Sequence, residues 1–187
     1  ESHHFDVFLD THSIEKGEPF QEELWHRMTD CDVILLLNTP GFLESHWCKE
    51  ELAEAGSKQI GIVQLVWPNH KVDAISHLSF PLKLEGADFV DTIYDNKDKS
   101  KLNNDKVEEI VQLVESVRAR NLASRQDNLI TEFMSIAKQC GRNITVQPER
   151  YLTEVISDKR IIYIPTIGVP QSFNCQAAKI QYRYNEN

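Results

Sequence analysis

The stretch Val33-Ile-Leu-Leu-Leu-Asn-Thr-Pro-Gly-Phe-Leu-Glu-Ser-His-Trp-Cys-Lys-Glu-Glu-Leu52 decides the fold. It opens with five apolar residues, which are too few for a helix and typical of a strand buried on both faces. Turn-forming residues follow over 38–41, and Ser45 stands where a helix can begin. Glu50 and Glu51 come early in that helix, just beyond the C-terminal end of a buried strand. Open α/β sheets keep their ligand sites at this position, so we expect a site here.

Length and charge limit the class of protein. The chain has 187 residues, of which 41% are hydrophobic and 26% charged, enough for one ordinary domain or for one small domain and part of another. The net charge of −9 argues against nucleic acid as a partner, because phosphate binding needs a basic surface. No apolar stretch approaches the roughly 20 residues that span a bilayer, and the N-terminus lacks a signal-peptide pattern. We therefore expect a cytoplasmic protein without a membrane partner.

The cysteines predict no metal site. Metal ligands usually come in pairs within a few residues, and none of the four cysteines has such a neighbour: Cys31, Cys48, Cys140 and Cys175. We interpret them as reduced thiols with packing roles. Cys48 beside Trp47 invites interpretation as a nucleophile, but no histidine-plus-carboxylate arrangement accompanies it, and a packed thiol explains it better. The adjacent pair His3-His4 is explained better by a solvated terminus than by a metal.

The first 90 residues alternate between strand and helix patterns. The expected elements are, in order, a strand over 5–9, a helix over 19–30, the central strand, a helix over 47–57, a strand over 60–67 and a weaker strand over 80–84. Pro81 predicts an edge position for the last strand. This alternation indicates a parallel sheet with right-handed crossovers.

The rest of the chain predicts a smaller, second unit. After a polar loop over 94–105, one amphipathic helical pattern is formed by Val107, Ile110, Val111, Val114 and Val117, and its stripe is expected to lie on the sheet. A second helical pattern, from Leu122 to Cys140, ends at Gly141. Two strands are expected over 143–147 and 160–164, followed by a rigid proline-containing loop. We therefore assign 1–118 to one domain and 119–187 to a partial second α/β module.

By Leu52 the ordered motifs resemble a TIR domain, most closely the prokaryotic NAD-cleaving type. The matching segments are Phe5-Asp-Val-Phe-Leu-Asp10, Ile14-Glu-Lys-Gly17, the aliphatic strand running into Thr39-Pro-Gly-Phe42, and Ser45-His-Trp-Cys-Lys-Glu-Glu-Leu52. The resemblance covers roughly residues 5–90. It implies an α/β fold with a flavodoxin-like parallel sheet flanked by helices, followed here by part of a second small α/β unit.

In that family the segment matching Phe5–Asp10 is the second strand. A first strand and loop that help hold the nucleotide have no counterpart before Phe5, so we expect either that the domain has lost them or that the sequence is partial. The alternative, in which Phe5–Phe8 is the first strand, leaves Asp10–Gly17 without a counterpart.

The resemblance implies cleavage of the bond between nicotinamide and ribose in NAD, with NAD as substrate and no cofactor. Aligned on Trp47-Cys48, the family's catalytic glutamate falls on Glu51, and Glu50 takes the variable position before it. One carboxylate suits this chemistry, because the cationic leaving group departs neutral and an anion stabilises the oxocarbenium-like transition state. The competing interpretation is a solvated helix carboxylate, since Glu50, Glu51 and Glu54 share the helix.

Other candidate residues each have a structural alternative. Asp10 suits contact with a ribose or a neighbouring subunit, or an Asx turn. Ser45 suits substrate contact or a helix cap, and Trp47 suits a pocket wall or a packing contact. Glu15 and Gly17 belong to the loop that in this family moves and mediates assembly. Gly17 is also explained by backbone freedom alone.

Two classes of function remain open at this point. As an enzyme, the protein hydrolyses or cyclises NAD when it is assembled, as a bacterial defence effector against phage. As a signalling adaptor, it acts by association between TIR domains without catalysis. In both, self-association is expected. A flavodoxin-like response regulator fits less well, because the acidic cluster and partner lysine expected at its strand ends are missing.

Overall fold

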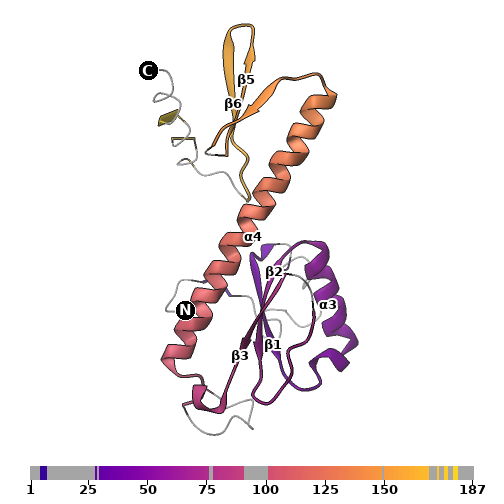
Figure 1. The fold of residues 1–187 in the computed structure, drawn as a ribbon, viewed down its shortest axis with the longest axis vertical. Coiled ribbons are helices and arrows are strands. Elements are labelled where there is room, and N and C mark those ends of the chain that lie inside the picture. Colours follow the sequence, from indigo (N-terminus) through magenta and orange to yellow (C-terminus); the bar gives the residue numbers. More distant parts are fainter. Residues whose placement is uncertain are drawn as a thin grey trace, which may run out of the picture. The chain divides into compact units, whose positions relative to one another are not determined.

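The computed structural model describes residues 5–7, 28, 30–75, 78–90, 101–148, 150–168, 172, 175–176 and 179–180. The chain divides into two compact units, residues 1–121 and 122–187. Helix α4 (Asn104–Gln139) supplies residues to both units, as Figure 1 shows. The two units are described one after the other.

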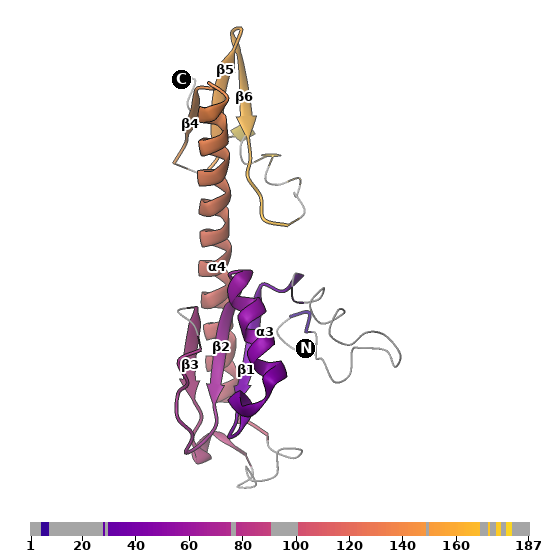
Figure 2. The same ribbon diagram turned by 90° about the vertical axis from the view of Figure 1, so that its right-hand side faces the viewer.

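The first unit is built on a parallel sheet. Its strands are β1 (Val33–Asn38), β2 (Gly61–Val66) and β3 (Ser79–Lys83), in the order β1-β2-β3. Helix α3 (His46–Ser57) covers one face of the sheet and the first part of α4 covers the other (Figures 1 and 2). The predicted parallel α/β sheet flanked by helices is therefore confirmed, and β3 lies at the edge that Pro81 indicated.

Alternating residues of the strands build two apolar cores. On the α3 side the buried residues are Met28, Leu36, Ala55, Ile60 and Ile62, with Ile34, Phe42, Leu52 and Ile75 packed against them. On the α4 side they are Val63, Leu65, Leu84, Phe89, Ile110 and Val117. Successive side chains of a strand point to opposite faces, so β2 supplies both cores. The stripe predicted for the first part of α4 does lie on the sheet.

Strand β1 is less buried than the sequence predicts, and β2 is the more buried of the two strands. All six residues of β2 are buried, whereas Leu35 and Leu37 of β1 are 48% and 54% exposed. The prediction that β1 is buried on both faces is wrong. Strand β2 occupies the middle of the sheet, and the residues of α4 pack against Val63 and Leu65 rather than against Leu35 and Leu37.

The N-terminal elements are only partly described. Of the strand predicted over 5–9, residues 5–7 are described and form no strand, so the prediction is wrong for them. Val7 is 70% exposed, and no strand pairing among the described residues includes this segment. Of the helix predicted over 19–30, residues 28 and 30 are described and helical, and Met28 is buried in the core on the α3 side.

Helix α4 is continuous over 36 residues, so the two helical patterns predicted from the sequence belong to one helix. Residues 118–121, between the two patterns, are Arg-Ala-Arg-Asn and contain neither glycine nor proline, and Arg and Ala are good helix formers. Nothing in this stretch therefore interrupts the helix. Gly141 ends it as predicted, with a positive φ of 68° and its N–H donated to the Lys138 carbonyl at 3.1 Å.

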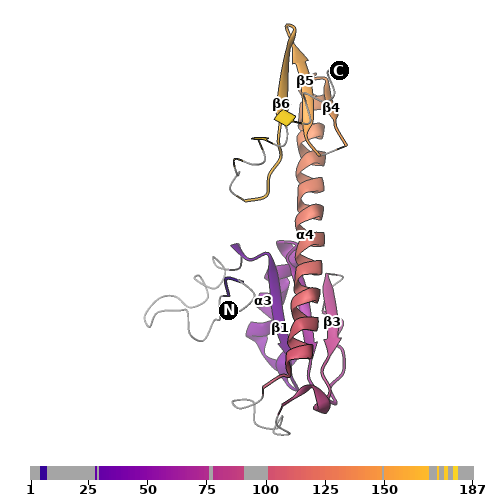
Figure 3. The same cartoon turned by 90° about the vertical axis from the view of Figure 1, so that its left-hand side faces the viewer.

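The second unit combines the last part of α4 with an antiparallel sheet, shown in Figure 3. Its strands are β4 (Ile144–Val146), β5 (Leu152–Ile156) and β6 (Lys159–Tyr163). The sequence predicted β4 and β6 but missed β5. The turn between β5 and β6 is Ser157-Asp158, both with positive φ, which is the geometry of a two-residue hairpin turn. Such turns usually contain Asn-Gly or Asp-Gly, so the sequence Ser-Asp did not indicate a hairpin and β5 was missed.

A buried carboxylate joins the strands of the second unit. Glu154 of β5 is 5% exposed and accepts hydrogen bonds from Arg142 Nε at 3.0 Å and from the Tyr163 hydroxyl at 2.7 Å. The hydrogen bonds from Arg142 and then from Tyr163 lower the pKa of Glu154 below its ordinary value. The hydrogen bond to Glu154 and burial raise the pKa of the Tyr163 hydroxyl.

These two shifts predict how the stability of the second unit depends on pH. A lowered carboxyl pKa stabilises the folded state above the unfolded pKa of about 4.3, and this contribution is lost as the pH falls through the folded value. A raised tyrosine pKa stabilises the folded state below the unfolded pKa of about 10, and this contribution is lost as the pH rises through the folded value. We expect thermal melts followed by circular dichroism to show a difference between wild type and Glu154→Gln that shrinks below about pH 4. A difference that stays constant from pH 3 to pH 7 would contradict this account.

Candidate functional site

The C-terminal ends of the parallel strands form one edge of the first unit. From the end of β1 the chain turns at Gly41, whose φ of 83° lies in the left-handed region. The turn continues into a short 3₁₀ helix (Phe42–Glu44) and then into α3. Parallel sheets bind ligands at this edge, since loops and helix N-termini gather there. The sequence motif of residues 45–52 therefore lies beside the edge where it was expected.

Ser45 is the N-cap of α3. Its backbone is extended (φ −72°, ψ 126°), and its hydroxyl oxygen accepts a hydrogen bond from the backbone N–H of Cys48 at 3.5 Å. The predicted capping role is confirmed, because one N–H of the first turn gains a partner in this way. Direct contact between Ser45 and a substrate stays a prediction.

Replacing the cap tests its contribution to the fold. We expect Ser45→Ala to lower the free energy of unfolding by about 0.5–1 kcal/mol, because the 3.5 Å hydrogen bond is long for a cap. Ser45→Asp keeps an acceptor at this position and is expected to change stability less. Urea unfolding followed by tryptophan fluorescence measures both. Equal losses for the two variants would show that the side-chain acceptor is not what stabilises the helix start.

Three carboxylates lie on α3, namely Glu50, Glu51 and Glu54. Glu50 Oε1 is 3.1 Å from His46 Nε2, and Glu54 Oε1 is 3.1 Å from Lys58 Nζ. Glu51 is partly buried and lies one turn before Ala55, which is completely buried. Residues one turn apart share a helix face, so Glu51 borders the face that α3 turns toward the sheet.

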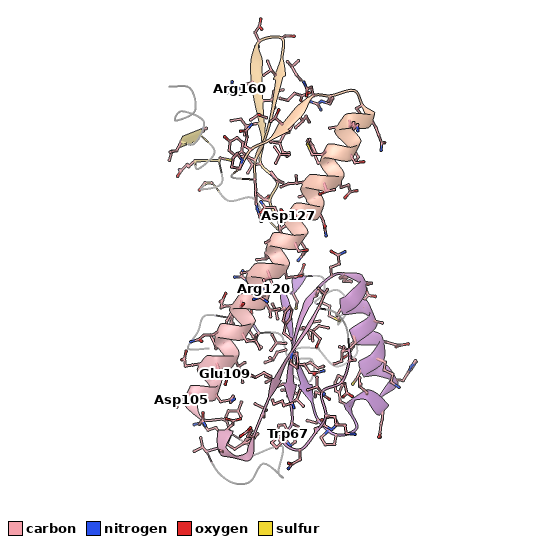
Figure 4. All side chains as sticks on the ribbon, in the orientation of Figure 1. Trp67, Asp105, Glu109, Arg120, Asp127 and Arg160 are labelled. Carbon is pink, nitrogen blue, oxygen red and sulfur yellow. The ribbon has the colours of Figure 1, made fainter. Side chains whose placement is uncertain are left out.

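The segment after β2, residues 67–75, contributes polar groups that the sequence did not single out. Trp67, labelled in Figure 4, follows β2 directly, and its ring lies 5.3 Å from that of Phe89 at an angle of 60°. Asp73 accepts a hydrogen bond from Asn38 Nδ2 at 3.1 Å and lies 3.5 Å from His70 Nε2. In the sequence, the available sign of these polar contacts was Gln64, a polar residue inside the apolar strand Gly61–Val66.

Several predicted site residues cannot be placed against this edge. Asp10, Glu15 and Gly17 lie outside the described residues, and so does the side chain of Trp47, whose backbone belongs to α3. The structure places Ser45 at the start of α3 and Glu51 within it, and the catalytic and substrate-binding assignments of all these residues stay predictions. Among the described residues, no group of three or more His, Cys, Asp or Glu side chains could hold a metal ion.

The cysteines offer little for nucleophilic chemistry in the part of the chain that is described. Cys48 is partly buried in the first turn of α3. Burial first, and then the nearby carboxylates of Asp30 and Asp32, raise the pKa of the Cys31 thiol above its ordinary value. A raised pKa keeps the thiol protonated, whereas a nucleophile needs the thiolate.

Comparison with known proteins gives one match. The family model described as the TIR domain matches residues 1–104, more than half of the chain. Neither the curated proteins nor the solved structures contain a match. Within the described residues, no helix has both the length and the apolar character needed to cross a membrane.

Proposed function

The chain belongs to the TIR domain family, and from this we propose that it cleaves the nicotinamide–ribose bond of NAD with Glu51 as the catalytic carboxylate. The observation that carries the proposal is the place of Glu51. It lies on α3, which starts at the Ser45 cap beside the C-terminal edge of a parallel sheet.

The proposed chemistry needs one well-placed anion. When the bond between ribose C1′ and the nicotinamide nitrogen breaks, its electron pair goes to nicotinamide, which leaves neutral and needs no general acid. Positive charge then develops on the ribose ring, and the Glu51 carboxylate stabilises it. Water adds at C1′ and gives up a proton to form ADP-ribose, or an internal nucleophile of the same molecule closes a cyclic product. Partial burial of Glu51 strengthens the stabilisation, because solvent screens a buried charge less.

We further propose that the enzyme works in the cytoplasm as an assembled bacterial defence effector, through association between TIR domains. Asp10, Ser45 and Trp47 are the proposed substrate contacts, and Glu15 and Gly17 belong to the proposed assembly loop. The proposed reaction uses NAD as substrate without a metal or further cofactor. The net charge of −9 disfavours direct binding of nucleic acid.

A second candidate function is a TIR signalling module that associates with other TIR domains without catalysis. The exposed apolar side chains of Leu35 and Leu37 on β1 support it, since exposed apolar surface favours association. The two functions differ in whether NAD is consumed. They share the family and the fold.

The test is the consumption of NAD by the full-length protein over a range of protein concentrations, with products separated by chromatography. We expect nicotinamide release at a rate per protein molecule that rises with concentration, as an assembled enzyme requires. The second product distinguishes hydrolysis from cyclisation. Absence of release at the highest concentration, also with a crowding agent, would favour the signalling module.

A further inference from the structure

The connection from β2 to β3 is unusual for a parallel sheet. Parallel neighbours need a crossover of a dozen or so residues, which is usually a helix. Here the described residues of the connection, 67–75 and 78, contain no helix. We call residues 67–75 the crossover segment. Its residue Ile75 packs against the core on the α3 side, so the segment passes over that face of the sheet.

An irregular segment lying on a sheet has backbone carbonyls that need hydrogen-bond donors, since it has no internal helical bonds. Two carboxamides of the strands supply them. Gln64 Nε2 of β2 donates to the Asp73 carbonyl at 3.1 Å, and Asn38 Nδ2 of β1 donates to the Lys71 carbonyl at 3.4 Å. Both carboxamide side chains are completely buried. The sheet itself thus holds the segment that covers it.

Asn38 also reaches the carboxylate of the segment. Its Nδ2 donates to Asp73 Oδ2 at 3.1 Å, and the same oxygen lies 3.5 Å from His70 Nε2. The Asp73 and His70 side chains are partly exposed. A continuous set of polar contacts therefore runs from a buried amide at the end of β1 to an imidazole at the surface.

The orientation of the two amides is determined by what they face. Each NH₂ group points at carbonyl or carboxylate oxygens, which only a donor can satisfy. Asn38 Oδ1 and Gln64 Oε1 are buried and accept no hydrogen bond from the described residues. Asn38 therefore holds the crossover segment through its NH₂ group alone.

This set of contacts shares its end and its face of the sheet with the helix that carries Glu51. Asn38 is the last residue of β1, seven positions before the Ser45 cap. Ile75 of the crossover segment and Leu52, which follows Glu51, pack against the same buried cluster. A shift of the segment is thus expected to change the edge where the substrate is proposed to bind.

We propose that Asn38, acting through Asp73, is a positioning residue that holds the crossover segment, with His70, against the NAD-binding edge. The inference rests on the proposed function, because it names a residue that shapes the same site. The buried NH₂ group keeps Asp73 in place, and Asp73 keeps His70 beside the edge. Loss of that NH₂ group is expected to weaken NAD binding more than it slows bond cleavage.

The decisive variant is Asn38→Asp, which has the same shape and replaces the NH₂ group by an oxygen facing the Asp73 carboxylate. The double variant Asn38→Asp/Asp73→Asn exchanges donor and acceptor and restores the hydrogen bond between residues 38 and 73 in the opposite direction, but it does not restore the bond to the Lys71 carbonyl. Asn143→Asp, at an exposed position of the second unit, is the control for the same change of charge. Each is made in the full-length protein.

Three measurements read out the variants. NAD affinity is measured by calorimetry in the Glu51→Gln background, where NAD is expected to be consumed much more slowly, and KM and kcat are measured with Glu51 present. Hydrogen exchange of peptides covering residues 67–75 reports the crossover segment directly. We expect Asn38→Asp to raise Kd and KM about tenfold with a much smaller fall in kcat, and to speed exchange in these peptides. The double variant is expected to recover part of both effects, because it remakes the bond to residue 73 and not the bond to the Lys71 carbonyl, and Asn143→Asp is expected to resemble wild type.

The outcomes separate this inference from the proposed function. Faster exchange with an unchanged Kd would overturn the positioning role, and so would a raised Kd that is no lower in the double variant than in Asn38→Asp. Unchanged exchange in Asn38→Asp would show that the amide does not hold the segment. If wild type releases no nicotinamide but its Kd for NAD still depends on Asn38, NAD cleavage is overturned and the positioning role stands. If the protein does not bind NAD, both NAD cleavage and the positioning role are overturned.

Discussion

Glu51→Gln is expected to lower the rate of nicotinamide release by about 100-fold or more, because it removes the charge and keeps the shape of the side chain. Losing one preorganised electrostatic contact in an active site typically costs a factor of about 10²–10³ in rate. The loss is expected in kcat, since the carboxylate faces charge that develops only in the transition state. Nicotinamide release followed by chromatography measures it.

The fold of the Glu51→Gln variant is expected to stay intact. Glu51 is only partly buried, and substitutions at such positions usually change the free energy of unfolding by about 0.5 kcal/mol or less. A melting temperature close to that of wild type therefore accompanies the loss of activity. Glu51→Asp keeps the charge but shortens the side chain by one methylene group, and an intermediate rate is expected for it.

Glu50→Gln is the matched control, because it makes the same chemical change one residue earlier on α3. Glu50 pairs with His46 on its own helix, and we expect its neutral variant to release nicotinamide at nearly the wild-type rate. Equal activity of the Glu50 and Glu51 variants would show that the acidic helix, and not Glu51, supports the reaction. Wild-type activity in Glu51→Gln would assign the catalytic charge to another residue.

The elements that the sequence predicted best are those with a strong local pattern. Strand β2 and helix α3 were predicted within two residues of their ends, because an apolar run and a serine cap mark them. Burial was predicted less well. The apolar run of β1 suggested the centre of a sheet, yet β2 is the central strand of the described sheet. The order of strands depends on pairing between distant segments, which a local pattern does not contain.

The same limit applies to the site, because a local sequence pattern does not show which distant polar residues meet at the sheet edge. Asn38 and Asp73 are 35 residues apart in the sequence and meet only because β1 and β2 are neighbours. Asn38 was interpreted as part of a turn, and Asp73 carried no signal at all. The catalytic role of Glu51 was predicted from a resemblance to a family motif and not from local patterning. The predictions for Asp10, Glu15 and Gly17 have the same origin, and these residues lie outside the described part of the chain.

Gly61→Ala is expected to lower the free energy of unfolding of the first unit by about 1–3 kcal/mol, because no space is left for its methyl group. A Cβ atom at this position would lie 2.6 Å from Val117 Cγ1 of α4. The helix cannot easily move away. Arg118 Nε is 2.8 Å from Asp32 Oδ2, and Asn121 Nδ2 donates to the Asp32 carbonyl at 3.1 Å, just before β1.

A second contact holds the same turn of α4 against the sheet. The Arg120 guanidinium, labelled in Figure 4, lies 5.8 Å from the centre of the Phe80 ring on β3. Next to Val117, helix α4 is thus attached both to Asp32, just before β1, and to Phe80 of β3. Relief of the clash must therefore come from Val117 itself, whose side chain is buried.

Val117→Ala removes the clashing methyl group and provides the test. Alone it is expected to cost about 2 kcal/mol, because it leaves a cavity between α4 and β2. In the Gly61→Ala background it also relieves the clash. The double variant is therefore expected to lose less unfolding free energy than the two single variants together, by about 1 kcal/mol or more. All three tryptophans of the chain belong to the first unit, so urea unfolding followed by fluorescence measures this unit. Additive losses would mean that the methyl group is accommodated elsewhere and that close packing of α4 at Gly61 does not limit the fold.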